Sequence, residues 1–175
     1  MTANRQRLFF ALWPDDETRD ALARLARAHL PAGSGRLVPA ENLHVTLVFL
    51  GAVDSGVRAC AERAASALSA PAFTLEFVRI GYWPRPRVLW SAPERTPAAL
   101  AELASTLTAA LVECGHRPES RPFRAHITVA RKVRKAPRAS LHDAVHWRVD
   151  AFHLIASETR PEGARYRRLR SWPLQ

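Results

Sequence analysis

The 175-residue chain is poor in cysteine and contains no long apolar run. Its two cysteines, Cys60 and Cys114, lie in Ala/Leu-rich helical segments without the paired spacing of a metal site. We therefore expect buried, reduced thiols and no zinc site. No stretch of about 18 apolar residues occurs, so no membrane span is expected. The amino-terminal "MTANRQRLFF" lacks the apolar core and cleavage site of a signal peptide, which favours a cytoplasmic protein.

The apolar residues that are present make up 47% of the chain and are distributed along its whole length. This distribution argues against disorder. A chain of this size buries roughly 70% of its unfolded surface, enough to fold without a metal or a disulfide. We therefore expect one domain over residues 1–175, and we expect a monomer.

Lysine is almost absent, and arginine carries nearly all of the formal net charge of +10. A basic surface attracts polyanions such as RNA or phosphorylated small molecules. Enrichment in arginine, alanine and proline can equally record a GC-rich genome, so the total charge leaves both explanations open. The run "RKVRKAPR" at 131–138 is more informative, because it holds both lysines and no acidic residue, although such runs are usually solvated loops.

Hydrophobic periodicity predicts short strands that alternate with helices, the pattern of an α+β fold. The predicted strands are 7–13, 41–50, 73–83, 87–92, 123–131, 145–157 and 164–174. The predicted helices are 16–30, 55–69 and 97–114. For the third helix we expect Thr96 as the N-cap, Pro97 in the first turn and Gly115 as the carboxyl-terminal stop.

One pattern occurs twice in this series. A strand, a helix and then a strand that begins His-x-Thr span about 7–50 and again about 87–131. The His-x-Thr sequences are "HVTL" at His44 and "HITV" at His126. A duplicated unit of this kind predicts two similar lobes related by a pseudo-twofold axis, with both His-x-Thr strands beside a shared cleft.

Two histidines that face one substrate can act as a general acid and a general base, because their ordinary pKa lies near neutrality. Cleavage of a phosphodiester requires such a pair. Thr46 and Thr128 share the strand face of His44 and His126 and can donate hydrogen bonds to phosphate oxygens. The sequence shows no carboxylate cluster or His-x-His set, so we expect no metal and no cofactor. Structural roles are expected for the remaining histidines, which are His29, His116, His142, His146 and His153.

These motifs resemble the two-histidine (2H) phosphoesterases, and among them the RNA 2′,3′-cyclic phosphodiesterases long called 2′-5′ RNA ligases. The resemblance covers nearly the whole chain, through "RLFFALWP", "ENLHVTLVFLG", "FRAHITVAR" and "YRRLRSWPL". It implies a bilobal α+β fold with two antiparallel sheets around a central cleft and helices on the outside. It also implies metal-independent opening of a 2′,3′-cyclic phosphate, on an RNA 3′ end or a nucleotide, to a 2′-phosphate.

The same resemblance implies individual roles. His44 is the proton donor to the leaving 3′ oxygen, and His126 is the proton acceptor that activates water. Arg131 matches an arginine that follows the family's second motif and could contact phosphate or stack on a base. Strict strand alternation would point Arg131 away from His126. Phe10 is a candidate for stacking on a base, as are the other aromatic side chains near the two ends, which are Trp13, Tyr166 and Trp172.

Other functions remain open at this point. The substrate could be a small cyclic phosphate such as ADP-ribose 1″,2″-cyclic phosphate, or a 2′-5′ linkage in an oligonucleotide, including its reversible ligation. A non-catalytic RNA-binding module would use the same basic cleft. The presence of both His44 and His126 argues against that last alternative.

Overall fold

The computed structural model describes residues 5–135, 137–161 and 163–175. Residues 1–4, which begin the stretch that lacks a signal-peptide pattern, and residue 136 of the basic run lie outside the described residues, as does residue 162. Within the described ranges, none of the helices has the length and apolar character needed to cross a membrane.

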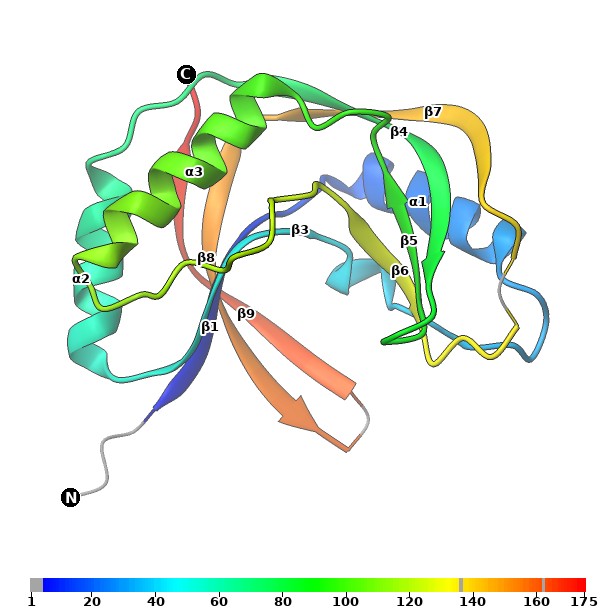
Figure 1. The fold of residues 1–175 in the computed structure, drawn as a ribbon, viewed down its shortest axis with the longest axis horizontal. Helices are drawn as coiled ribbons and strands as arrows, with labels where there is room; N and C mark the ends of the chain where they lie inside the picture. Colours follow the sequence, from blue (N-terminus) through cyan, green and yellow to red (C-terminus); the bar gives the residue numbers. More distant parts are fainter. Residues whose placement is uncertain (1–4, 136, 162) are drawn as a thin grey trace.

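The described residues form nine strands, three α-helices and one short 3-10 turn (Figure 1). The strands are β1 (Gln6–Leu12), β2 (Arg36–Leu37), β3 (Val45–Val53), β4 (Phe73–Trp83), β5 (Val88–Ala92), β6 (Ile127–Arg131), β7 (Ser140–Val149), β8 (Ala151–Arg160) and β9 (Gly163–Pro173). The helices are α1 (Asp16–His29), α2 (Ser55–Ser66) and α3 (Ala98–Val112), and the turn η1 is Ala40–Asn42. The predicted α+β class is confirmed.

All strand pairs of the described residues are antiparallel, and the sheet has two halves. One half has the order β7-β4-β5-β6 and the other has the order β3-β1-β8-β9, with β2 paired to β6. Among the described residues, a single pair, Val45 with Ile127, joins the halves. The two expected sheets are therefore continuous at their inner edges, through β3 and β6. These strands begin one residue after His44 and His126, so each contains the threonine of one His-x-Thr sequence.

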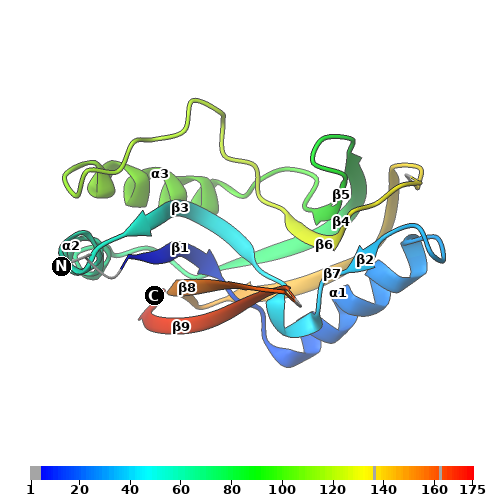
Figure 2. The same cartoon turned by 90° about the horizontal axis from the view of Figure 1, so that it is seen from below.

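Helices α1 and α3 each pack against the half of the sheet that does not contain the strand preceding them. Helix α1 follows β1 but packs against β6 and β7 of the other half, whereas α3 follows β5 but packs against β3 and α2. Figures 1 and 2 show α1 at one end of the molecule and α2 with α3 at the other. Each repeated unit thus contributes a helix to the opposite half. The duplication that the repeated motif suggests stays a prediction.

The helix starts follow from local sequence. The Asp15 carboxylate accepts a hydrogen bond from the Thr18 amide, and Asp54 caps α2 in the same way through Val57. Helix α3 starts differently from our prediction, because its N-cap is Pro97 and Thr96 is not part of the cap. The Thr96 hydroxyl instead accepts from the amide of Ala125, in the segment that leads into β6.

Three strand predictions were also wrong in their bounds. Strand β3 begins at Val45 rather than at residue 41, because residues 40–42 form the turn η1, so His44 lies one residue before the strand. Strand β6 begins at Ile127 rather than at residue 123, since the two halves of the sheet separate here and only Ile127 pairs with β3. The predicted strand 145–157 is in fact parts of two strands, β7 and β8. The chain changes from one half of the sheet to the other at Asp150, between them.

The expectation of two reduced cysteines is wrong. Cys60 and Cys114 form a disulfide with a Cα–Cα distance of 5.6 Å. Cys60 lies in α2 and Cys114 lies just beyond the end of α3. The pairing depends on the packing of α2 against α3, which the sequence spacing of 54 residues does not reveal.

Candidate active site

The pairing of β3 with β6 brings the two His-x-Thr sequences together. Val45 and Ile127 are fully buried partners, so the residues on either side of them face the opposite surface of the sheet. His44 and Thr46 flank Val45, and His126 and Thr128 flank Ile127, so this one pair brings both sequences to the same surface. The two imidazoles lie close enough for the charge of His126 to lower the pKa of His44. All four side chains line one groove, an arrangement that suits two groups that bracket one phosphate.

Both imidazoles are held in the same way by the backbone. His44 Nδ1 lies 2.7 Å from the carbonyl oxygen of Asn42, and His126 Nδ1 lies 2.8 Å from that of Arg124. A carbonyl oxygen can only accept, so each Nδ1 carries the proton and donates it. Each Nε2 is therefore free to exchange a proton with a bound substrate, and the two histidines share one tautomer.

Aromatic side chains pack against both histidines. The indole of Trp13 stacks on the imidazole of His44, with 5.0 Å between the ring centroids and an interplanar angle of 5°. The ring of Tyr166 meets the same imidazole edge to face, with 5.3 Å between the centroids. The indole of Trp83 contacts His126 at 4.7 Å. We had not predicted a role for Trp83, because it lies at the end of β4, outside both motifs. These contacts restrict the rotation of the imidazoles.

Burial lowers the pKa of both histidines. The pKa of His44 falls from 6.5 to about 4, mainly through desolvation and to a lesser extent through the positive charges of Arg131 and His126. The hydrogen bond to Asn42 opposes this change. The pKa of His126 is lowered by desolvation and, to a lesser extent, by Arg131, against its hydrogen bond to Arg124. Without a bound anion, desolvation therefore favours the neutral form of both imidazoles.

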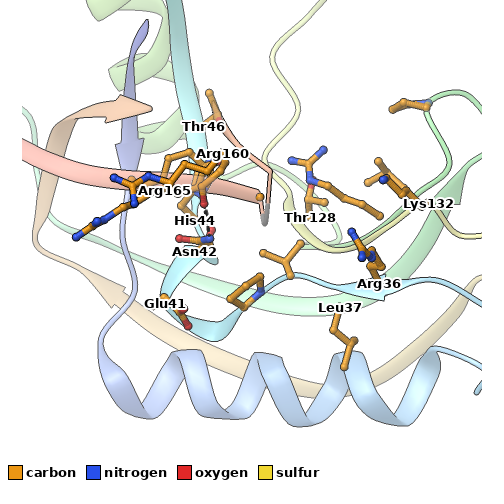
Figure 3. Close-up of a pocket in the computed structure, with 18 of the residues that line it drawn as sticks. Arg36, Leu37, Glu41, Asn42, His44, Thr46, Thr128, Lys132, Arg160 and Arg165 are labelled. Carbon is orange, nitrogen blue, oxygen red and sulfur yellow. Dashed lines mark hydrogen bonds between the residues drawn. The ribbon is translucent and has the colours of Figure 1, made fainter. Parts of the chain in front are cut away.

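The histidines and threonines line a groove of about 730 Å³ that is rich in positive charge (Figure 3). Arg131 lines this groove even though strict alternation predicted the opposite. It is the last residue of β6, and Lys132 follows it with a φ of +54°, a left-handed conformation that turns the chain beside the site. The other basic residues of the lining are Arg36, Lys132, Arg160 and Arg165. The groove is thus suited to an anion.

Five of the six predicted site residues lie in the groove, and one lies in the core. His44, Thr46, His126, Thr128 and Arg131 all line the groove. The prediction for Phe10 is wrong, because its side chain is fully buried against Phe152 and Trp172 in the main core. Its neighbour Phe9 lies on the other face of β1, with 5.1 Å between its ring centroid and that of the His44 imidazole. Both faces of β1 are buried here, so sequence alternation could not tell them apart.

The other aromatic candidates for base stacking also lie in different parts of the structure. Tyr166 lines the groove, whereas Trp172 is buried with 7% exposure and belongs to the main core. None of the five remaining histidines lines the groove. One of them, His153, is buried between strands and hydrogen-bonded to Ser171 at 2.8 Å, and burial lowers its pKa to about 4.

Metal-binding groups are scarce in the part of the chain that the structure describes. No cluster of three or more His, Cys, Asp or Glu side chains occurs there that could hold a metal ion. The polar side chains that line the groove are mainly imidazoles, hydroxyls, guanidinium groups and an ammonium, with one carboxylate from Glu41 and one amide from Asn42. Such groups can transfer protons and bind phosphate oxygens directly.

Comparison with known proteins gives consistent results. The model of the 2′-5′ RNA ligase superfamily matches residues 14–161. The RNA 2′,3′-cyclic phosphodiesterase of Escherichia coli K12 is 34% identical over 171 residues, which cover 97% of either chain. That of Archaeoglobus fulgidus is 31% identical over 174 residues, covering 94% of this chain and 98% of the relative.

The fold is also similar to a solved structure. The crystal structure of Escherichia coli LigT complexed with 3′-AMP superposes with a TM-score of 0.90 at 34% identity, covering 97% of this chain and 98% of that one. The match includes both halves of the sheet, because it spans nearly the whole of both chains. From its sequence and its structure, the chain belongs to the 2′-5′ RNA ligase superfamily.

Proposed function

We propose that this protein is a hydrolase that opens 2′,3′-cyclic phosphates at RNA 3′ ends, leaving a 2′-phosphate. One observation carries the proposal: His44 and His126 flank a single strand pair, with matched tautomers, in a groove lined by cations. The names of the curated relatives support the same activity. The structure of LigT with 3′-AMP supports a nucleotide as the ligand of such a groove.

The reaction follows from the two free Nε2 atoms. His126 Nε2 accepts a proton from a water molecule as the water oxygen forms a bond to phosphorus. The bond between phosphorus and the 3′ oxygen breaks, and His44 Nε2–H donates its proton to that oxygen. The phosphate stays on the 2′ oxygen, and proton exchange with solvent restores both histidines. This assignment of acid and base follows the family resemblance.

The remaining groove residues stabilise the charge on phosphorus. The hydroxyls of Thr46 and Thr128, which line the groove together with both histidines, donate hydrogen bonds to non-bridging oxygens. Arg131 contributes a charged donor from the end of β6. No step requires a metal ion, because the two imidazoles carry both proton transfers.

The bound phosphate also explains how His44 can act as an acid. In the empty groove its pKa is about 4, too low for a proton donor at neutral pH. A phosphodiester between the two imidazoles adds a negative charge where burial and Arg131 disfavour positive charge. The anion therefore stabilises one positively charged imidazole in the pair. Because the two histidines interact, they titrate as a coupled pair.

Hydrolysis of adenosine 2′,3′-cyclic phosphate tests the proposal. We expect turnover in excess EDTA and a product whose phosphate is on the 2′ oxygen, identified by phosphorus NMR. A 3′-phosphate would reverse the assignment of acid and base. Loss of activity on chelation, restored by one divalent metal, would contradict the two-histidine mechanism.

A comparison of kcat/KM on other substrates separates the alternatives. ADP-ribose 1″,2″-cyclic phosphate and a 2′-5′-linked dinucleotide present the same phosphodiester chemistry with a different surrounding. We expect the RNA-type cyclic phosphate to be the best substrate, and a higher kcat/KM for either of the others would reassign the substrate. The cytoplasmic location and the monomeric state stay predictions, and sedimentation would test the latter.

A further inference from the structure

A second hollow adjoins the catalytic groove. It has a volume of about 410 Å³, within the range of roughly 300–1,000 Å³ typical of ligand sites. Three of its lining residues, Trp13, Ile155 and Arg168, do not line the groove. Neither the reaction at the cyclic phosphate nor the packing of the core accounts for this hollow.

A ridge separates the two cavities and belongs to both. It consists of Glu41 and Asn42 from η1 and the segment 164–166 of β9, all of which line both cavities. The Asn42 side-chain amide donates a hydrogen bond of 3.1 Å to the carbonyl oxygen of Ala164, which ties η1 to β9 across the ridge. Figure 3 shows Asn42, Glu41 and Arg165 on the His44 side of the groove. A ligand that crosses this ridge therefore leaves the groove beside His44.

The chemistry of the second hollow suits a nucleotide. Arg165 lies on the ridge and lines both cavities, whereas Arg168 lines only the second hollow. Two guanidinium groups are therefore available to a ligand that passes from the groove into the hollow. Trp13 and Tyr166 add two half-buried aromatic rings, 5.8 Å apart and nearly perpendicular. Arginine and aromatic side chains in alternation are typical of surfaces that bind single-stranded nucleic acid, where arginine contacts phosphate and rings stack on bases.

We propose that the second hollow binds the penultimate nucleotide of an RNA 3′ end, with Arg165 and Arg168 on the phosphate that links it to the terminal nucleotide. This inference rests on the proposed function, because it places the terminal cyclic phosphate between His44 and His126. It makes the enzyme selective for RNA ends over free cyclic mononucleotides. Arg168 is then a specificity-determining residue that does not touch the reacting atoms.

Three substrates separate the contributions of phosphate and base. They are adenosine 2′,3′-cyclic phosphate, the same nucleotide with a 5′-phosphate, and the dinucleotide ApA with a terminal 2′,3′-cyclic phosphate. We expect kcat/KM to increase about tenfold with the 5′-phosphate, the effect of a charged hydrogen bond at a partly exposed site. A further increase of about fivefold or more is expected for the dinucleotide, because one stacked base is added.

Arg168→Gln is the test variant, and Arg167→Gln is its matched control. Both residues are exposed on β9, but Arg167 pairs with Ala156 and lines neither cavity. Arg168→Gln should reduce the preference for the 5′-phosphorylated over the unphosphorylated nucleotide by about three- to tenfold. Arg167→Gln should leave that preference unchanged.

Salt dependence gives an independent measurement. On a 12-nucleotide RNA with a cyclic 3′ end, the slope of log(kcat/KM) against log[salt] should become shallower by about 0.7 in Arg168→Gln, the value for one lost contact to single-stranded phosphate. Equal kcat/KM for all three small substrates would overturn the inference while the proposed function stands. An equal effect of Arg167→Gln would overturn it too, as a general charge effect. Failure to hydrolyse any of the substrates would instead overturn the proposed function.

Discussion

Binding of a nucleotide phosphate should raise the pKa of His44 from about 4 to near neutrality. Desolvation, the main cause of the low value, disfavours a positive charge in the empty groove, and the charges of Arg131 and His126 add to it. A unit negative charge about 4 Å from the imidazolium, at an effective dielectric constant of about 20, contributes about 4 kcal/mol. Since one pKa unit corresponds to about 1.4 kcal/mol, the pKa moves to about 7.

The assay is a pH titration of the histidine ring signals by NMR, without and with 2′-AMP. The His44 signal is assigned by its loss in His44→Gln. His153 is an internal control, because burial lowers its pKa to about 4 as well but it lines neither cavity. We expect the pKa of His44 to rise on nucleotide binding and that of His153 to stay constant. The reasoning is refuted if free His44 titrates at its ordinary value, or if both pKa values move together.

The same change should appear in the pH–rate profiles. The profile of kcat/KM reports the free enzyme and that of kcat reports the complex. On the alkaline side, activity is lost when His44 releases its proton, so the alkaline limb of kcat should lie at a higher pH than that of kcat/KM. Arg131→Gln should raise the pKa of His44 and His126 in the free protein, because it removes a cation that lowers both.

Three further predictions concern stability and substrate binding. Cys60→Ser or Cys114→Ser should lower the free energy of unfolding by about 4 kcal/mol, the loop-entropy value for a separation of 54 residues. Urea unfolding with and without reductant measures this change, and an unchanged midpoint would contradict the prediction. Phe10→Ala should cost about 3–5 kcal/mol of stability because the ring is fully buried, and a change in KM without a lower melting temperature would show instead that it binds substrate. Thr46→Ala and Thr128→Ala should each lower kcat by about 2- to 13-fold, the equivalent of one neutral hydrogen bond, and a loss as large as that of a histidine variant would contradict this role.

The sequence predicted most of what depends on local chemistry. Apolar periodicity is a property of neighbouring residues, so the first two helices begin close to their predicted positions, although the caps Asp15 and Asp54 were not among our predictions. The repeated His-x-Thr pattern predicted which residues line the groove, because alternation fixes the face of a residue relative to its neighbours. The pairing of Val45 with Ile127 then brings both sequences to one groove.

What the sequence could not predict depends on packing between distant elements. Phe9 and Phe10 are equally apolar, and only the position of β1 between two layers decides which ring lies near His44. The disulfide forms because α2 packs on α3, and α2 lies between the two repeated units whereas α3 lies within the second. Trp83 reaches His126 from β4, through a strand that does not pair with β6. No local pattern carries this information.

The most direct test of the account is the turnover of the two histidine variants on adenosine 2′,3′-cyclic phosphate. His44→Gln and His126→Gln should each reduce kcat by at least about 100-fold, the lower range for loss of a general acid or base. The double variant should be little slower than either single variant, because the two groups act as a unit. Turnover near the wild-type rate in either single variant would contradict the two-histidine mechanism.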